Sequence, residues 1–111
     1  MKREVISIYF KSGILFASLE NTSYHELKNI ITIAGIKYLV LKLESLCIND
    51  YEKICFVTYN YNLIMQNNGK FILCGNVERE LSHKLFYLDI VSVKDDVTAL
   101  NLLERWSKWI I

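Results

Sequence analysis

The stretch from Tyr38 to Leu43 is the feature that most limits how this chain can fold. It reads Tyr-Leu-Val-Leu-Lys-Leu, so apolar residues occupy successive positions instead of alternating with polar ones. Successive side chains of a strand point to opposite faces, so both faces of such a strand must be covered. Strands of this kind belong to parallel sheets that carry packed helices. The stretch therefore predicts an α/β fold.

Segments on either side of this strand alternate between strand and helix patterns. Residues 5–10 and 14–19 are rich in β-branched and aromatic residues, and they flank Lys11-Ser12-Gly13. This arrangement predicts an opening β-hairpin with Gly13 at positive φ. Beyond the hairpin, apolar residues recur at helical or strand spacing. The predicted order is helix 24–34, strand 38–43, helix 51–66, strand 71–74, helix 77–88, strand 90–93 and helix 97–106.

Residues with strong positional preferences mark the ends of the predicted helices. Ser23 precedes the first helix and Glu26 stands three positions later, which forms a capping box. Gly35 is expected to end this helix in the left-handed conformation. Asp50 is expected to cap the second helix. The other junctions are Asn67-Asn68-Gly69, Gly75-Asn76 and a cap at Asp95 or Asp96.

The order of elements predicts one domain that spans residues 1–111. A chain of 111 residues has the usual size of one domain, and no repeat or linker interrupts it. Because a helix follows every strand after the hairpin, right-handed crossovers and largely parallel pairing are expected. We therefore expect a mixed, mostly parallel sheet of about five strands, flanked by about four helices.

The charge and hydropathy of the chain exclude several classes of protein. Its net charge is +1 with the two signs interspersed, so no basic face for nucleic acid is predicted. No segment approaches the about 20 apolar residues that a membrane span requires, so direct membrane insertion is not expected. The charged N-terminus runs straight into a strand pattern and does not resemble a signal peptide. A soluble, cytoplasmic protein is expected.

No pattern of residues indicates a metal site. Cys47, Cys55 and Cys74 are odd in number and match no zinc spacing. Their apolar neighbours favour small buried thiols in a reducing compartment. His25 and His83 have no second ligand at helical or hairpin spacing, so both are expected at the surface. We predict no metal and no other cofactor.

No pattern indicates catalysis either. The sequence contains neither a Gly-rich phosphate loop nor a Gly-x-Ser-x-Gly elbow. Asp50 and Glu52 stand at a helix start, where the helix dipole favours acids without any role in proton transfer. Together with Glu78, they also argue against an anionic ligand at the helix starts. We predict no catalytic residue and expect that the protein is not an enzyme.

The chain resembles a STAS domain, the family of bacterial anti-sigma-factor antagonists and of the domains appended to sulfate transporters. The resemblance covers nearly the whole chain and includes the opening hairpin, the apolar third strand and the final amphipathic helix. The segments that carry it are Thr22-Ser23-Tyr24-His25-Glu26-Leu27, Asn49-Asp50-Tyr51-Glu52 and Gly69-Lys70-Phe71-Ile72-Leu73-Cys74-Gly75.

The regulatory motif of that family is only partly present. Its third strand typically leads through Asp-Leu-Ser to Asp-Ser-Ser/Thr-Gly-Leu at the second helix. Here Lys42 replaces an acid of the strand, whereas Asp50 matches the acid that precedes the helix. Tyr51 stands at the serine that partner kinases phosphorylate, and Glu52 stands at the next hydroxyl residue. Lys53 replaces the glycine, and Ile54 matches the leucine.

The resemblance implies a non-catalytic module that binds a signalling protein and regulates transcription. Because a phenol extends further than a serine hydroxyl, we predict no serine-type phosphorylation at Tyr51. Glu52 and Asp50 place permanent negative charge where a phosphate would be added. The protein is then either locked in one binding state or adapted to another partner. A shift of one residue in the alignment would leave Ser45, in the loop after the strand, as the nearby serine.

The expected binding surface lies at the start of the second helix. Loops that follow parallel strands meet at one edge of the sheet, so the neighbouring strand-to-helix loops should contribute to it. The expected partner is an anti-sigma-type kinase or another signalling protein. The partner-binding residues predicted in this way are Asp50, Tyr51, Glu52, Lys53, Asn21, Thr22, Ser23 and Asn76.

The C-terminus motivates an alternative function. Trp106 continues the apolar stripe of the last helix, and Trp109 lies beyond what the domain needs to cover its sheet. Exposed tryptophan can anchor a partner or a second copy, so these two residues form a candidate secondary interface and leave a homodimer open. The alternative function is a small STAS subunit of a larger complex, such as a lipid-transport ABC transporter.

Overall fold

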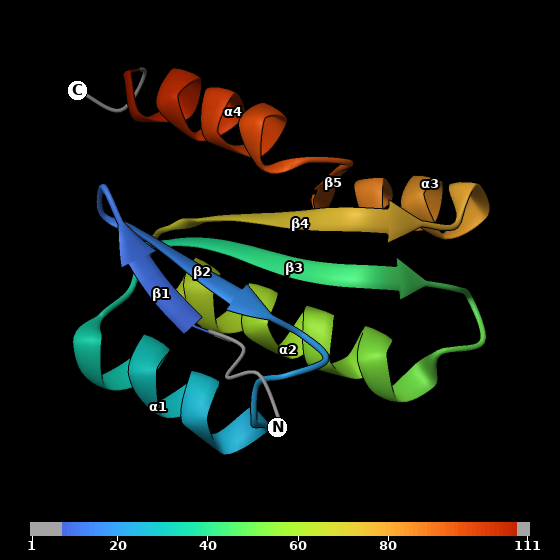
Figure 1. Cartoon of the computed structure of the whole chain (residues 1–111), viewed down its shortest axis with the longest axis horizontal. Coiled ribbons are helices and arrows are strands. Elements are labelled where there is room, and N and C mark those ends of the chain that lie inside the picture. The colour runs from blue at the N-terminus through green and yellow to red at the C-terminus, as the bar shows by residue number, and fades with distance from the viewer. Residues whose placement is uncertain (1–7, 109–111) are drawn as a thin grey trace, which may run out of the picture.

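The computed structural model of the protein describes residues 8–108, with the side chains described as far as Arg105. Strands and helices alternate after an opening hairpin, as expected, and the chain folds into one α/β unit (Figure 1). The elements are β1 (Ile8–Lys11), β2 (Ile14–Ser18), α1 (Tyr24–Ala34), β3 (Tyr38–Leu46), α2 (Tyr51–Gln66), β4 (Lys70–Val77), α3 (Arg79–Tyr87), β5 (Val91–Val93) and α4 (Asp96–Lys108).

The sheet has five strands in the order β1-β2-β3-β4-β5, so each strand pairs only with its neighbours in sequence. β1 is antiparallel to β2, and the other pairs are parallel. Right-handed crossovers between parallel strands in this order place every connecting helix on the same side. Figure 1 shows α1 and α2 below the sheet and α4 above it. The predicted mixed, mostly parallel sheet is confirmed.

One face of the sheet, here called the three-helix face, packs against α1, α2 and α3. Leu39, Leu41 and Leu43 of β3 point to this face, as alternate residues of a strand must. The buried side chains of this face are Leu15, Ala17, Leu19, Leu27, Ile31, Ile36, Leu39, Leu41, Leu43, Leu46, Val57, Ile64, Phe71, Leu73, Leu81, Leu85 and Ile90.

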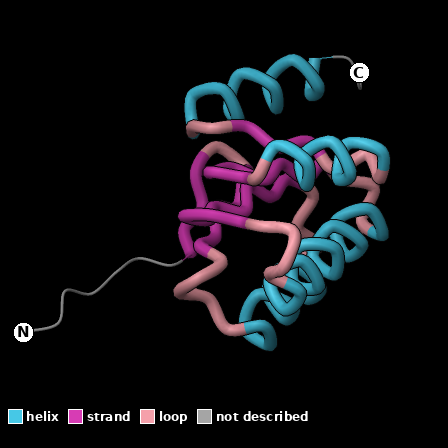
Figure 2. The backbone as a smooth tube through the Cα atoms, turned by 90° about the vertical axis from the view of Figure 1, so that its right-hand side faces the viewer, coloured by secondary structure: helices cyan, strands magenta, loops and turns pink. Residues whose placement is uncertain are grey.

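The opposite face, here called the α4 face, packs against α4 alone. Val40 lies on this face between Leu39 and Leu41, so β3 is buried on both sides as its sequence predicts. In the view turned by 90°, the helix that leads to the C-terminus lies apart from the others (Figure 2). The buried side chains of this face are Ile14, Phe16, Val40, Ile72, Cys74, Ala99 and Leu103.

The opening hairpin turns through two residues. Ser12 has φ 55° and Gly13 has φ 80°, which is the combination of a type I′ turn. The prediction of positive φ at Gly13 is therefore confirmed. Tyr9 of β1 stacks on Phe16 of β2 with ring centroids 4.8 Å apart, which covers Phe16 on the α4 face.

Local signals also placed the ends of α1 correctly. The backbone N–H of Glu26 donates to Oγ of Ser23 over 3.2 Å, as the predicted cap requires. Gly35 has φ 62° and ψ 42°, and the N–H of Ile36 donates to the carbonyl of Ile31. This left-handed ending closes the helix as its sequence predicts.

The end of α2 is tied to the end of α1 by one side chain. Nδ2 of Asn67 donates to the carbonyl of Ile31 over 3.2 Å and to the carbonyl of Ile36 over 2.9 Å. The carbonyl of Ile31 also accepts from the N–H of Ile36, and Ile36 lies just beyond the cap of α1. Asn67 therefore ends its own helix and connects it to the end of the neighbouring one.

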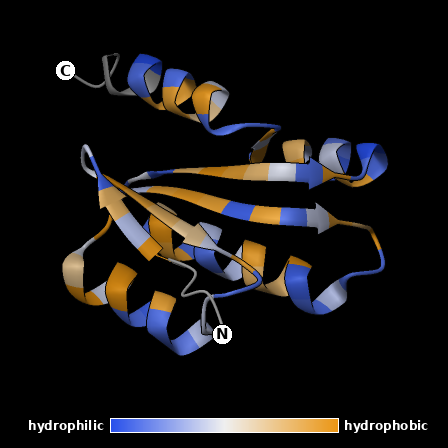
Figure 3. Ribbon diagram, viewed as in Figure 1, coloured by the Kyte–Doolittle hydropathy of each residue, from blue (hydrophilic) through white to orange (hydrophobic). Residues whose placement is uncertain are grey.

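Strand β4 is longer than the predicted strand 71–74, and Asn76 lies within it rather than in a loop. Gly75 sits where β3 bulges between Leu43 and Ser45, and Asn76 pairs with Ser45 beyond this bulge. A Cβ at Gly75 would lie 2.1 Å from the carbonyl oxygen of Leu43, and its φ is 153°. The glycine therefore continues the strand through a close contact. Figure 3 shows the ribbon of β4 turning hydrophilic toward its end, which is why the sequence there reads as a loop.

The final helix takes its cap from Asp95. Oδ1 of Asp95 accepts from both the backbone N–H and the hydroxyl of Thr98, each over 2.8 Å. These bonds hold the pKa of the Asp95 carboxyl below its ordinary value. Asp96, the other predicted cap, turns its carboxylate toward the sheet instead.

Among the helices of residues 8–108, none combines the length and the apolar character needed to cross a bilayer.

Candidate functional site

The loop before α2 is closed by two carboxylates. The N–H of Cys47 donates to Oδ2 of Asp50 over 2.8 Å, and the N–H of Ile48 donates to Oε2 of Glu78 over 3.1 Å. Asp50 stands at the expected N-cap position, but its side chain makes no bond to the helix. The prediction that the side chain of Asp50 caps α2 is therefore wrong, because its carboxylate accepts from the N–H of Cys47 instead. These two hydrogen bonds hold the loop that leads into α2.

An aromatic groove begins at this helix start. Tyr51 and Glu52, both predicted from the sequence, line it together with a tyrosine from the start of α1. The groove has a volume of about 410 Å³, and its lining residues are Tyr24, Tyr51, Glu52, Cys55, Phe56 and Tyr59. We use the name aromatic groove for these six residues.

The groove forms because two helices present matching faces. Tyr51, Cys55 and Tyr59 follow one another at intervals of four along α2, so they share one side of the helix. Tyr24 reaches them from α1, with its ring centroid 4.8 Å from that of Tyr59 and 6.0 Å from that of Phe56. Sequence reasoning missed Tyr24, Phe56 and Tyr59, although the interval of four on α2 was a readable signal.

The side chains of Tyr24 and Tyr59 shift each other's pKa. Hydrogen bonding between them raises the pKa of Tyr24 and lowers the pKa of Tyr59. The ammonium of Lys28 also lowers the pKa of Tyr59, through its charge and a hydrogen bond.

Tyr51 is a strongly exposed member of the groove, with 73% of its surface accessible. Glu52 is exposed beside it, and Lys53, the next predicted residue, is half-buried and does not line the groove. The ring of Tyr51 stands at the rim, where a partner could cover it.

Other predicted residues serve local structure. Nδ2 of Asn21 donates to Oγ of Ser18, Thr22 is buried, and Ser23 caps α1. None of these three lines the groove, whereas the next residue, Tyr24, does. The reason is that β2 ends at Ser18, which pairs with Lys42, whereas β3 continues beyond Lys42 to Leu46. The start of α1 therefore lies alongside the middle of α2 rather than at its first residue.

The tryptophans of the candidate secondary interface are not placed by the structure. Trp109 lies outside the described residues, and the side chain of Trp106 lies beyond the last described one.

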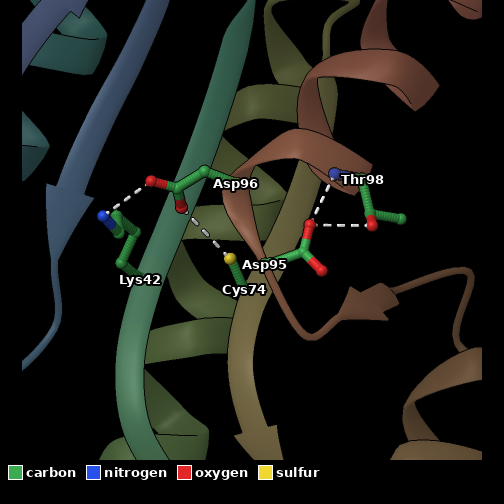
Figure 4. Close-up of polar contacts among 5 residues, drawn as sticks. All are labelled: Lys42, Cys74, Asp95, Asp96 and Thr98. Carbon is green, nitrogen blue, oxygen red and sulfur yellow. Dashed lines mark hydrogen bonds and ion pairs between the residues drawn. The ribbon is translucent and has the colours of Figure 1, made fainter.

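A second polar site lies on the α4 face (Figure 4). Nζ of Lys42 pairs with Oδ2 of Asp96 over 2.9 Å, and Sγ of Cys74 donates to Oδ1 of the same carboxylate over 3.4 Å. The bond to Asp96 raises the pKa of Lys42, although partial burial opposes this. Lys42 thereby joins β3 to the first turn of α4.

The prediction that the cysteines are buried holds for one of the three. Cys74 is buried, and burial together with Asp96 raises the pKa of its thiol to about 11. Such a thiol stays protonated and is a poor nucleophile at neutral pH. Cys47 and Cys55 are exposed, which corrects the prediction of buried thiols. Cys55 faces outward because it shares the face of α2 that carries Tyr51. His25 and His83 are exposed, as predicted.

Comparison of the chain with protein-family models, with curated proteins and with solved structures gives no match. Among the described residues, no group of three or more His, Cys, Asp or Glu side chains is placed to hold a metal ion.

Proposed function

We propose that the protein is a non-catalytic interaction module of the STAS type, which regulates a signalling partner through the start of α2. The observation that carries this proposal is the exposed aromatic groove at the position where that family places its regulatory switch. Tyr51 and Glu52, which stand at the two hydroxyl positions of the motif, both line the groove.

The chemistry of the groove supports a protein partner. Aromatic side chains combine a large contact area with few rotatable bonds, and they are enriched among residues that dominate binding energy. Tyr24 and Tyr51 are both exposed and line the same groove. A surface of this kind gains stability when a partner removes it from water.

The fold is also compatible with the proposed family. The opening hairpin, the alternation of strands and helices, and the final helix are features on which the resemblance rests. Lys42 departs from the family motif, which has an acid in this strand. Its ion pair with Asp96 connects β3 to α4.

The proposed module lacks the serine switch. Because Tyr51 and Glu52 occupy the hydroxyl positions, binding is set by a permanent carboxylate and a phenol rather than by serine phosphorylation. Partner binding should therefore respond little to serine kinases and depend directly on these two side chains.

Photo-crosslinking from inside the groove tests the proposal. A benzophenone amino acid replaces Tyr51 in one version of the full chain and Tyr87 of α3 in the other. Tyr87 is a matched control because it is also a strongly exposed tyrosine, with 87% of its surface accessible. After irradiation in cells of the source organism, crosslinked proteins are identified by mass spectrometry.

A signalling protein that crosslinks at position 51 and not at position 87 supports the proposal. The crosslink should also be lost when Glu52→Lys is added and retained when Glu80→Lys is added. Crosslinks at position 87 alone, or transporter subunits at either position, would replace the proposal with another interface or with the transporter function.

A further inference from the structure

We propose that the aromatic groove binds a cationic side chain of the partner protein, specifically an arginine. This inference rests on the proposed function and deepens it, because it names the chemistry that the partner must present. It depends on the composition of the groove, on the angles between its rings and on the placement of Glu52.

The lining of the groove is aromatic rather than aliphatic. Four of its six residues are Tyr or Phe, and none is Leu, Ile, Val or Met. An aromatic ring has a negative face, and a cation within about 6 Å of its centre is attracted to it. An aliphatic side chain gains nothing from this property, so the lining favours a cation over a leucine or valine.

The rings are arranged so that several can contact one group. Tyr24 lies at 65° to Phe56, with centroids 6.0 Å apart, and at 40° to Tyr59. The ring of Tyr24 is therefore inclined to both of its neighbours, and all three rings line the groove together with Tyr51. A flat guanidinium can stack on one ring while its edge meets another.

Charge complementarity comes from Glu52. It is the only carboxylate among the six lining residues and is exposed, and a carboxylate can form a bidentate contact with a guanidinium. No lysine, arginine or histidine is among the six lining residues. An arginine is favoured over a lysine because it combines ring stacking with the paired contact.

The test compares two small probes that differ in charge. N-acetyl-arginine amide and its uncharged isostere, N-acetyl-citrulline amide, are titrated into the full chain carrying 13C-labelled tyrosine. The ring signals of Tyr24, Tyr51 and Tyr59 report on the groove, and those of Tyr9 and Tyr87 serve as internal controls.

The arginine probe should shift the three groove signals saturably and leave the control signals in place. The citrulline probe should bind about fivefold more weakly, because it lacks the cation. Glu52→Gln should weaken the arginine probe about threefold and leave the citrulline probe unchanged. Glu80→Gln is the matched control, since Glu80 is also the second residue of its helix, and it should have no effect.

The rings can be tested in the same way. Tyr59→Phe keeps the ring and should retain binding, whereas Tyr59→Leu should reduce it about fivefold. Tyr87→Leu should have no effect. The tyrosine spectra in the absence of probe show whether each variant keeps its fold.

Three outcomes overturn the inference: equal affinity for the arginine and citrulline probes, tighter binding of N-acetyl-leucine amide, or no saturable shift up to about 0.1 M, where even weak single contacts register. Failure of the probes with retained crosslinking at position 51 overturns the cation while the interaction module stands. Probe binding without any partner crosslink overturns the proposed function instead.

Discussion

The two faces of the sheet are built from the same strands but differ in what covers them. The three-helix face packs α1, α2 and α3 onto Leu, Ile, Val and Phe side chains in one continuous cluster. The α4 face has a smaller cluster under a single helix, and a polar triad of Lys42, Cys74 and Asp96 lies at the start of that helix. The α4 face is therefore less completely covered by helices than the three-helix face.

The difference follows from the strand order. When parallel strands are added one after another in the same direction, every right-handed crossover falls on one side. The other side receives only the segment that follows the last strand, which here is α4. One helix does not seal a whole sheet, so water reaches Lys42 and Asp96, whose side chains remain 40% accessible. A charge pair is tolerated there because it keeps part of its hydration.

Neighbouring residues of β4 give the strongest test of this comparison. Leu73 points to the three-helix face and Ile72 to the α4 face, and both are fully buried. We expect Leu73→Ala to cost about 4 kcal/mol and Ile72→Ala about 2–3 kcal/mol, because a single helix can move to fill a cavity. Urea unfolding of the two variants measures the difference. Equal losses would mean that the faces are equally rigid.

Replacing Gly75, which lies at the bulge, should disturb the pairing of β3 with β4 and so affect both faces of the sheet. Gly75→Ala places a Cβ against the carbonyl of Leu43, at a φ that other residues rarely adopt. We expect a loss of about 3 kcal/mol in the free energy of unfolding. Gly13→Ala in the hairpin also has positive φ but meets open space, so it should cost about 1 kcal/mol. A small loss at Gly75 would show that the two strands separate there at little cost.

Removing the cation of the triad should loosen the α4 face alone. Lys42→Met leaves Asp96 without its ion pair, and we expect a loss of about 1 kcal/mol, since the pair is partly solvated. Because opening of α4 exposes Cys74, labelling of this thiol should become about fivefold faster. Cys47 and Cys55 should label quickly in every variant. Lys94→Met, beside the start of α4, is the control that should leave the Cys74 rate unchanged.

The α4 face should also make the stability depend on pH. The Cys74 pKa is raised from 9.0 to about 11 in the folded protein, so the folded state holds this proton more tightly than the unfolded state. The resulting stability is present below pH 9 and is lost as the pH rises toward 11. Lys42, whose pKa is also raised, adds to the loss above pH 10.5. The urea midpoint should fall less between pH 9 and 11 in Cys74→Ala than in Cys55→Ala.

The sequence predicts most of the fold because local signals agree with it. Ser23 and Gly35 mark the ends of α1 through interactions within one or two turns, and the apolar run of β3 requires a covered sheet. The extent of β4 was not predictable in this way. Gly75 looks like a break in the chain, and its role depends on a bulge in the neighbouring strand.

The candidate site was only half predictable, for a related reason. Tyr51 and Glu52 were found from their place at the start of a helix, whereas Tyr24 and Tyr59 belong to the site only because α1 packs beside α2. Asp50 shows the limit of local reasoning. It has the residue type and position of a cap, yet its carboxylate bonds to the N–H of Cys47. Which backbone N–H group binds a carboxylate in a loop depends on the path of the backbone.

The strand order also bears on how the chain reaches its folded state. Every pair of strands in the sheet is formed by consecutive strands, so the contacts of this largely parallel sheet have short sequence separations. Folding rates rise as the mean separation of contacting residues falls. The sheet can therefore grow outward from any one hairpin or strand–helix–strand unit. We expect the chain to fold faster than parallel sheets whose central strands come from distant parts of the sequence.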